Sequence, residues 1–296
     1  MVTVPSPFVR RHWLAREIRR LRHEHACSGD QLAEAAGIPR HQLRDLENGR
    51  KGPDIDVVAA VCDYLSVGSR RREEIMHAAA DGWSVGWWEA CAARMGHRQA
   101  RYADLESGTQ AIEEYALGLI PGLLQTADFA SARMRSDPAR QTADFDPDAA
   151  VAARAHRQRL LLAESGPRYD LVLDEFAVRR CAADPAVVAA QLRHIADLCA
   201  RHPSITVRIL PIDAPIKGHR APRSAYSIYR YRDEHGTLAV AVDTLTTDLV
   251  LTELADVDAY LSLHSRLKAA ALTPRASMQM LATIAPRLCP TEGAAA

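Results

Sequence analysis

The 296-residue sequence lacks the features of a secreted or membrane-bound chain. It contains no apolar run near the roughly 18 residues that suggest a membrane span, and the opening MVTVPSPFVRRHW holds no apolar signal-peptide region. No Cys-x-x-Cys pair suggests a zinc ribbon or redox motif among the six scattered cysteines, Cys27, Cys62, Cys91, Cys181, Cys199 and Cys289. We therefore expect a cytoplasmic protein without membrane contact, whose thiols are buried and reduced.

Net charge is also absent, since 37 Lys and Arg balance 37 Asp and Glu. This balance argues against a strongly basic protein that coats nucleic acid. The charge is nevertheless uneven: residues 1–53 carry 10 basic and 6 acidic side chains (+4), which leaves 27 and 31 for the remainder (−4). A few well-placed cations are enough for a single DNA half-site, so the basic head remains compatible with DNA binding.

Signatures of catalysis are missing as well. The sequence shows no nucleophile elbow, no phosphate-cradling glycine loop and no cluster of metal ligands. Asp174 and Glu175 end a strand-like run and are candidates for acid–base work, but adjacent residues on a strand point to opposite faces. His219 is the best lone candidate for a proton shuttle. An enzyme is thus the rival class, and we expect no catalytic residue, no cofactor and no metal site.

Helical spacing dominates the first 80 residues. Leu14, Ile18 and Leu21 recur at i, i+4 and i+7, which predicts one apolar stripe. Ser28 is a good N-cap for a second helix, and Gly37 ends that helix. After a loop closed by Pro53, Asp54 can cap another amphipathic helix, whose stripe contains Ile55, Val58, Cys62 and Leu65.

Residues 29–48 have the order of a helix-turn-helix. Leu32 and the small Ala33 lie in the first helix, Gly37 in a tight turn, and Leu43 and Leu46 in the second helix. The polar residues of the second helix then face outward. They form either a solvated surface or a face that contacts base edges.

This stretch, LAEAAGIPRHQLRDLENGRKGPD above all, resembles the Cro and phage-repressor (XRE) family across residues 14–66. The resemblance implies a five-helix DNA-binding domain whose second motif helix enters the major groove of double-stranded DNA. It assigns bases or nearby phosphates to Arg40, His41, Gln42 and Arg44. It assigns the DNA backbone to Arg50, Lys51 and the first amides of the Ser28 helix. A helical bundle that has lost DNA binding is the structural alternative.

The sequence changes character near residue 83. Three of the four tryptophans, Trp83, Trp87 and Trp88, lie close together, either as core or interface residues, which we favour, or as a ligand-stacking site. Strand-like runs follow at residues 169–174, 205–211, 225–231, 238–242 and 248–252, with helical patterns between the first two runs and after the last. We predict an α+β fold: an all-α five-helix domain followed by a mixed α/β domain with a small sheet and packed helices.

Residues 95–285 carry a second resemblance, through IPGLLQTADFA, RAHRQRLLL, LVLDEFAVRR, QLRHIADL, VRILP and AYLSLHSRLKAAAL. These segments are similar to a domain of unknown function that follows the helix-turn-helix in many actinomycete-type regulators. The resemblance implies a regulator, often linked to a small partner protein in an antitoxin-like arrangement.

The expected domains are a DNA-binding head (residues 1–80), a helical connector (81–108), an α/β sensing, partner-binding or dimerisation domain (109–288) and a flexible tail (289–296). We expect a transcriptional regulator that binds an inverted-repeat operator as a homodimer. The alternative is an interaction module that holds a small partner protein, with DNA binding secondary.

Overall fold

The computed structural model forms two compact units. The first contains residues 1–89, 104–109 and 231–237, and the second contains residues 90–103, 110–230 and 238–296. The residues that the structure describes are 6–49, 51–136, 144–219, 221–232, 236–244 and 248–288. Arg50, Cys289 and the predicted tail, residues 289–296, lie outside these ranges. None of the helices within them is long and apolar enough to cross a membrane.

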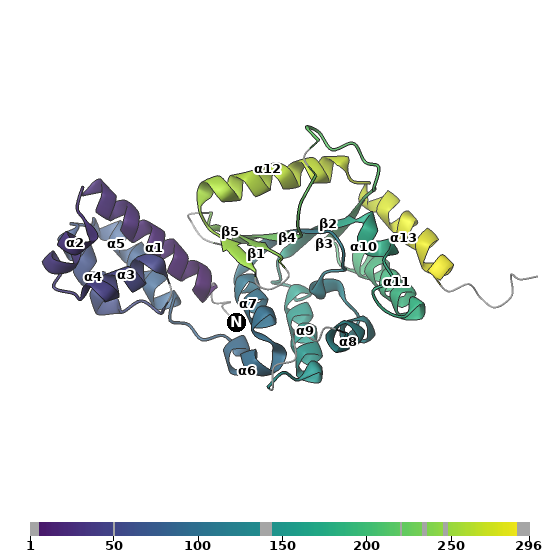
Figure 1. The fold of residues 1–296 in the computed structure, drawn as a ribbon, viewed down its shortest axis with the longest axis horizontal. Coiled ribbons are helices and arrows are strands. Elements are labelled where there is room, and N and C mark those ends of the chain that lie inside the picture. Colours follow the sequence, from purple (N-terminus) through teal and green to yellow (C-terminus); the bar gives the residue numbers. More distant parts are fainter. Residues whose placement is uncertain are drawn as a thin grey trace, which may run out of the picture. The chain divides into compact units, whose positions relative to one another are not determined.

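Five helices make up most of the first unit (Figure 1). Ser28 caps the second of them as predicted: its Oγ accepts a hydrogen bond from the amide of Gln31, whose side chain accepts one from the amide of Ser28. Asp54 caps the fourth by accepting from the amides of residues 56 and 57. The predicted five-helix head is confirmed, with bounds α1 Pro7–Glu24, α2 Gly29–Ala35, α3 Arg40–Asn48, α4 Ile55–Tyr64 and α5 Ser69–Asp81.

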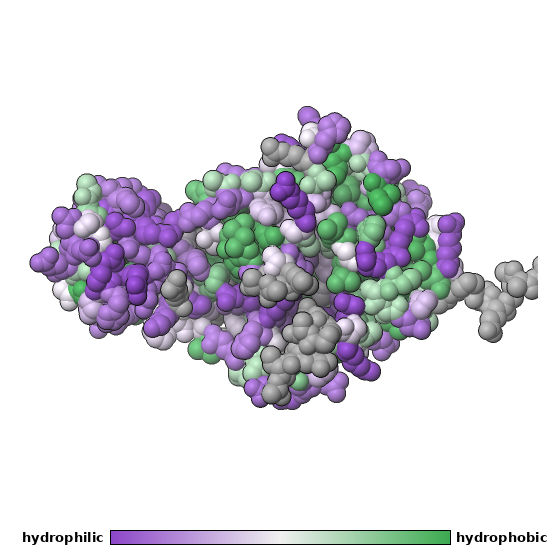
Figure 2. All heavy atoms as spheres, in the orientation of Figure 1, coloured by the Kyte–Doolittle hydropathy of each residue, from purple (hydrophilic) through white to green (hydrophobic). Residues whose placement is uncertain are grey.

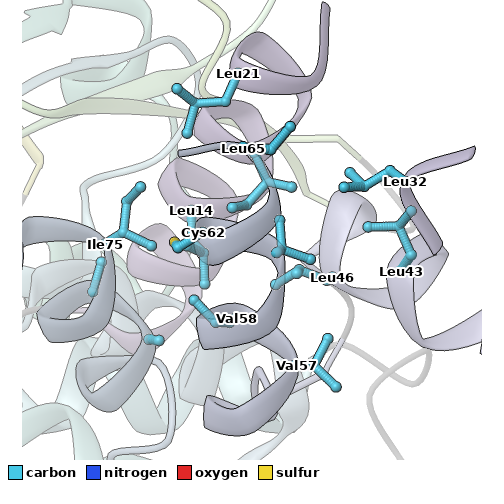
Figure 3. Close-up of a cluster of buried hydrophobic side chains, with 14 of the residues drawn as sticks. Leu14, Leu21, Leu32, Leu43, Leu46, Val57, Val58, Cys62, Leu65 and Ile75 are labelled. Carbon is cyan, nitrogen blue, oxygen red and sulfur yellow. The ribbon is translucent and has the colours of Figure 1, made fainter. Parts of the chain in front are cut away.

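The core of this unit contains the apolar stripes that the spacing predicts. Figure 3 shows side chains from all five helices meeting there. Leu32 of α2 and Leu43 of α3 are both fully buried in this core. The two motif helices pack on each other there. Other members of the cluster are Leu14, Ile18, Leu46, Val58, Cys62, Leu65 and Ile75. Because α3 uses only one face for this core, its opposite face is left for solvent or a ligand.

The second unit is built on a six-stranded sheet with the order β3-β2-β1-β4-β5-β6. β2 runs parallel to β1 and β3, whereas β5 runs antiparallel to β4 and β6. The five predicted strands are all present, as β2 Arg168–Asp174, β3 Ile205–Leu210, β4 Tyr226–Tyr231, β5 Leu238–Val242 and β6 Leu249–Leu251.

The sixth strand, β1 (Thr109–Ala116), was not expected. The sequence TQAIEEYA places two glutamates in the middle of a strand that occupies a central place in the sheet. Their carboxylates are paired: Arg230 contacts Glu113 at 2.8 Å, and the Tyr169 hydroxyl donates to Glu114 at 2.5 Å. These partners come from the neighbouring strands, so they compensate the charge only after the sheet has formed.

Helices cover this sheet in the way that a mixed α/β domain requires. α12 (Leu254–Ala270) lies along one face of the sheet in Figure 1 and contacts β3 and β5. Between β2 and β3 the chain forms the predicted crossover helix α11 (Pro185–Arg201), which packs on α13 (Pro274–Leu288) and β3. The remaining helices are α6 Trp87–Met95, α7 His97–Glu106, η1 Gly122–Leu124, α8 Ala127–Arg135, α9 Pro147–Leu161 and α10 Glu175–Arg179.

Two buried glutamine side chains hold the backbone of the segment IPGLLQTADFA (residues 120–130) in place. The Gln125 side chain donates to the carbonyl of Ile120 at 2.6 Å. Gln191 of α11 donates to the carbonyl of Leu124 and accepts from the amide of Thr126, both at 2.7 Å. Between Ile120 and Thr126 the backbone forms no α-helix or strand. The two glutamine side chains therefore satisfy backbone groups that would otherwise be buried without a hydrogen bond.

Two expectations about the core need correction. Cys62 is buried, but Cys91 and Cys181 are exposed and Cys27 and Cys199 are only partly covered. The general tendency of thiols to be buried therefore fails at Cys91 and Cys181, where the thiol faces solvent. The tryptophans also separate: Trp88 is buried, Trp87 is half-buried, and Trp83 is 59% exposed. Trp83 is thus not a core residue, and its place in an interface stays a prediction.

Candidate nucleic-acid interface

The turn between α2 and α3 has the geometry that a helix-turn-helix needs. Gly37 adopts a left-handed conformation with φ 67°, which costs an L side chain energy but not glycine. The amide of Ile38 then donates to the carbonyl of Ala33 at 2.9 Å, which closes the end of α2. The chain therefore reverses within four residues, and α3 begins at Arg40.

α3 is strongly amphipathic. Leu43, Leu46 and Glu47 form its buried face, and His41, Arg44 and Asn48 are exposed on the opposite face. Gln42 lies on the flank and is half-exposed. The side chains of His41, Gln42 and Arg44 make no hydrogen bond or ion pair with any described residue. These three side chains are therefore free to bind a ligand.

Asn48 is a candidate contact residue that sequence reasoning missed. It follows Arg44 by four residues and His41 by seven, the spacing of one helix face. In the sequence, the glycine at position 49 marks Asn48 as the end of the helix. In the structure, Gly49 adopts the left-handed conformation of such an end, with φ 62°. The i, i+3, i+7 spacing from His41 is the signal that could have identified it.

Arg40 lies apart from the rest of the predicted set. Its Nε is 2.7 Å from Oδ1 of Asp30, and its guanidinium covers Gly29 so closely that an added Cβ there would collide with Nη2. The side chain is therefore held at the start of α2, beside the Ser28 cap. Ser28 itself is exposed, with its hydroxyl oxygen occupied by the amide of Gln31.

Lys51 lies in the loop after α3, as the resemblance implies. Its ammonium is 3.6 Å from Asp45 and its side chain is 78% exposed. An exposed pair of this kind contributes little to stability and does not prevent an approaching phosphate from binding. Arg50, the other predicted backbone contact of this loop, lies outside the described residues.

α3 is fixed against α1 by polar contacts as well as by leucines. The carboxylate of Glu47 lies 2.6 Å from Nε of Arg22, and both side chains are largely buried. A second nitrogen of Arg22 donates to the carbonyl of Cys27 at 3.1 Å, so one guanidinium joins α1, the loop before α2 and α3. At the end of α3, an added Cβ on Gly49 would meet the carbonyl oxygen of Arg11 at 3.1 Å.

A second buried carboxylate joins α1 to α5. Glu17 accepts hydrogen bonds from Arg20 at 2.6 Å and from Arg71 at 2.8 Å. Burial alone raises the pKa of Glu17, but these hydrogen bonds and charges outweigh it and lower the pKa from 4.5 to about 2. Arg71 also lies over the ring of Trp13, 5.1 Å from its centroid. The helix that supports α3 is thereby held to the rest of the head.

Hydrophilic residues dominate the head on the face that Figure 2 shows. This surface is consistent with the sequence, in which residues 1–53 carry the excess of basic side chains. A polar surface is what a ligand made of phosphates and base edges requires.

The candidate acid–base residues of the second unit are used within the fold. Asp174 accepts from the Tyr115 hydroxyl and from the amide of Phe176, both at 2.9 Å. Glu175 is the first residue of α10 rather than a strand residue, and it accepts from the amide of Ile212 at 3.0 Å and from Arg179 at 2.5 Å. His219 is exposed in a loop with φ 53°. No described contact brings these three residues together, and the described part holds no group of three metal-ligating side chains.

Comparison with known families agrees with both halves of this description. Residues 13–75 match the model of a helix-turn-helix domain, which confirms the resemblance of the head and indicates DNA binding. Residues 99–283, well over half of the chain, match the model of a domain of unknown function, DUF5753. The chain therefore belongs to the DUF5753 family and carries a helix-turn-helix domain before it. Neither the curated proteins nor the solved structures contain a match.

Replacing Glu17 by Gln should destabilise the head. The folded-state pKa lies below the unfolded value, so the carboxylate stabilises fully above about pH 4.5 and loses this effect as the pH falls towards 2. We expect Glu17→Gln to lower the free energy of unfolding by about 2 kcal/mol at pH 7, since solvent screens part of the interaction with the half-exposed Arg20. Urea unfolding of the full chain between pH 7 and pH 2 measures this.

Glu24→Gln is the matched control for this change. Glu24 also contacts Arg20 but is exposed, so its replacement should change stability by less than about 0.5 kcal/mol. An equally steep loss of stability at acid pH in the Glu17→Gln variant and the wild type would contradict the assignment.

Proposed function

We propose that this chain is a sequence-specific, DNA-binding transcriptional regulator that acts as a homodimer on an inverted-repeat operator. The observation that carries the proposal is the outer face of α3: His41, Gln42 and Arg44 are held on a helix whose other face is fixed to the core, and no described residue occupies them. Rigid presentation of free donors and acceptors is what base recognition in the major groove requires.

The proposed contacts divide into two groups. His41, Gln42, Arg44 and Asn48 lie on the exposed face or flank of α3 and reach base edges. Lys51 follows the helix and binds phosphate, and Arg40, held at the start of α2, is placed for phosphate rather than for a base. Gln pairs well with adenine and Arg with guanine, which gives the preferred bases at two positions.

The homodimer is proposed because one short helix contacts too few base pairs. Two linked half-sites raise affinity by about 10²–10⁴ over a single site without any new type of contact. We assign assembly and sensing to the DUF5753 domain and no catalytic role, since Asp174 and Glu175 are hydrogen-bonded within the fold and His219 contacts neither. In this proposal the regulator acts in the cytoplasm.

A second function, capture of a small partner protein, is favoured by one surface feature. Phe176 and Ile212 are 46% and 71% exposed, and the amide of Ile212 is bonded to Glu175, next to Phe176 in the chain. We assign these two exposed side chains to the apolar part of such a contact. In this alternative DNA binding is secondary, and removal of residues 1–80 leaves partner capture intact.

Genome-wide footprinting with the purified full chain tests the main proposal. The expected result is a set of bound sites that share an inverted repeat, with half-site centres about one helical turn of DNA apart. Binding without any shared sequence, or no binding at all, would reject a sequence-specific regulator.

Gln42→Ala and Arg44→Ala test the contacts to bases. Each variant should weaken operator binding by about 1–3 kcal/mol and relax the preference at one base position, because each loses one base contact. Gel shifts with the operator and with its single-base variants measure both effects. Glu34→Ala, an exposed change on α2, serves as a control and should bind as the wild type does. Unchanged affinity in both Gln42→Ala and Arg44→Ala would remove α3 from the interface.

Lys51→Ala tests the contact to the DNA backbone. It should weaken binding to all DNA sequences alike and lower the slope of log affinity against log salt by about one, because one phosphate contact is lost. Titrations at several salt concentrations with operator and random DNA measure this. A loss confined to the operator would show that Lys51 contacts a base instead.

The homodimer is tested by comparing the full chain with residues 1–89 alone, the segment of the first unit that contains its five helices. Sedimentation should report a dimer for the full chain and a monomer for the fragment, with operator affinity at least about 100-fold lower for the fragment. DNA with a single half-site is the matched control, on which the two proteins should bind equally. A monomeric full chain with the same operator affinity as the fragment would overturn the dimer.

A further inference from the structure

Trp83 makes an unusual contact with the loop that follows α3. It lies just after α5, beyond the segment 13–75 that matches the helix-turn-helix model. Its indole covers Gly52 so closely that an added Cβ there would lie 2.7 Å from Cδ2 of the ring. The indole N–H also donates a hydrogen bond to the carbonyl of Pro53. One side chain therefore holds two consecutive residues of the loop.

Neighbouring residues complete this support. An added Cβ on Gly82 would lie 3.1 Å from Cδ of Pro53 and 3.1 Å from Cγ of Arg11. Arg11 donates from Nη1 to the carbonyl of Gly82 at 3.0 Å, and its own backbone carbonyl supports Gly49 at the end of α3. The loop is thus held at its start by α1 and at residues 52–53 by Gly82 and Trp83.

Core packing does not account for Trp83. The side chain is 59% exposed and is not a member of the buried cluster of the head, so the five helices pack without it. An exposed tryptophan that stacks on a glycine loses rotamer freedom without burying much apolar surface. The contact is better explained by what it does to the loop.

Lys51 immediately precedes the supported residues. Its side chain is 78% exposed and, among the described residues, pairs only weakly with Asp45, so the backbone of the loop sets the region that its ammonium can reach. A flexible cation loses entropy when it binds a phosphate, and fixing the chain beforehand reduces that cost.

We propose that Trp83 is a positioning residue for DNA binding: it holds residues 51–53 so that Lys51 meets the DNA backbone. This inference rests on the proposed function and adds a residue outside the helix-turn-helix segment to it. Trp83 itself contacts no DNA in this account. Its effect on binding passes through the loop and, in particular, through Lys51.

Trp83→Ala, Lys51→Ala and the double variant test the proposal in the full chain. Each single change should weaken binding to operator and random DNA alike, by about fivefold, and lower the salt slope by about one. If Trp83 acts through Lys51, the double variant should bind DNA about as tightly as the single variant with the lower affinity. Val85→Ala, a change of a 76% exposed neighbour, is the control and should bind as the wild type does.

Two further variants keep the test independent of folding. Gly52→Ala should reproduce the loss of Trp83→Ala, because its methyl group displaces the ring, and Trp83→Phe should restore part of the affinity by returning a ring to Gly52. Amide hydrogen exchange without DNA should be faster at residues 52–53 in Trp83→Ala than in the wild type, with an unchanged melting temperature.

The outcomes separate the inference from the proposed function. Wild-type protein that binds no DNA would reject the function itself. A Trp83→Ala variant that binds DNA as tightly as the wild type would overturn the inference but not the proposed function. Additive losses in the double variant would also overturn it, because they would mean that Trp83 contacts DNA independently of Lys51.

Discussion

The docking of α3 on α1 is the constraint on which the candidate interface depends. α3 packs on α1, Leu43 and Leu46 belong to the apolar core that the helices share, and the buried pair of Glu47 with Arg22 joins the two helices directly. A buried ion pair often adds little net stability, yet breaking it is costly because one charge is left without a partner. The pair therefore penalises other orientations of α3 more than it stabilises the native one, and this gives the exposed face of the helix a defined direction.

Local patterns predicted most of the fold because most elements carry their own signal. The head is a succession of amphipathic helices with capping residues at Ser28 and Asp54, and five strands are short apolar runs between turn residues. β1 escaped prediction because Glu113 and Glu114 interrupt its apolar pattern. Their partners, Arg230 and Tyr169, are distant in sequence, so the pairing that makes the strand acceptable arises only in the folded sheet.

The candidate site was predicted only in part, because local spacing reveals which residues share a helix face but not which distant residues meet. Helical spacing was sufficient to place His41 and Arg44 on an outer face, and it could have added Asn48. Spacing could not show that Arg40 turns back to Asp30 across Gly29, nor that Trp83 packs on Gly52, since both contacts join residues from different elements. Contacts of this kind depend on tertiary structure, and no local pattern in the sequence announces them.

Pairing within the head also limits how its positive charge can act. Arg20, Arg22 and Arg71 bind the buried carboxylates of Glu17 and Glu47, so these cations support the fold and not a ligand. The excess of basic residues in residues 1–53 already counts these two carboxylates, so it is small and the pairing leaves it unchanged. With few phosphates neutralised, we expect non-specific binding to be weak and to depend little on salt. In the proposed regulator, affinity then comes from base contacts and from joining two half-sites, the role that we assign to the second unit.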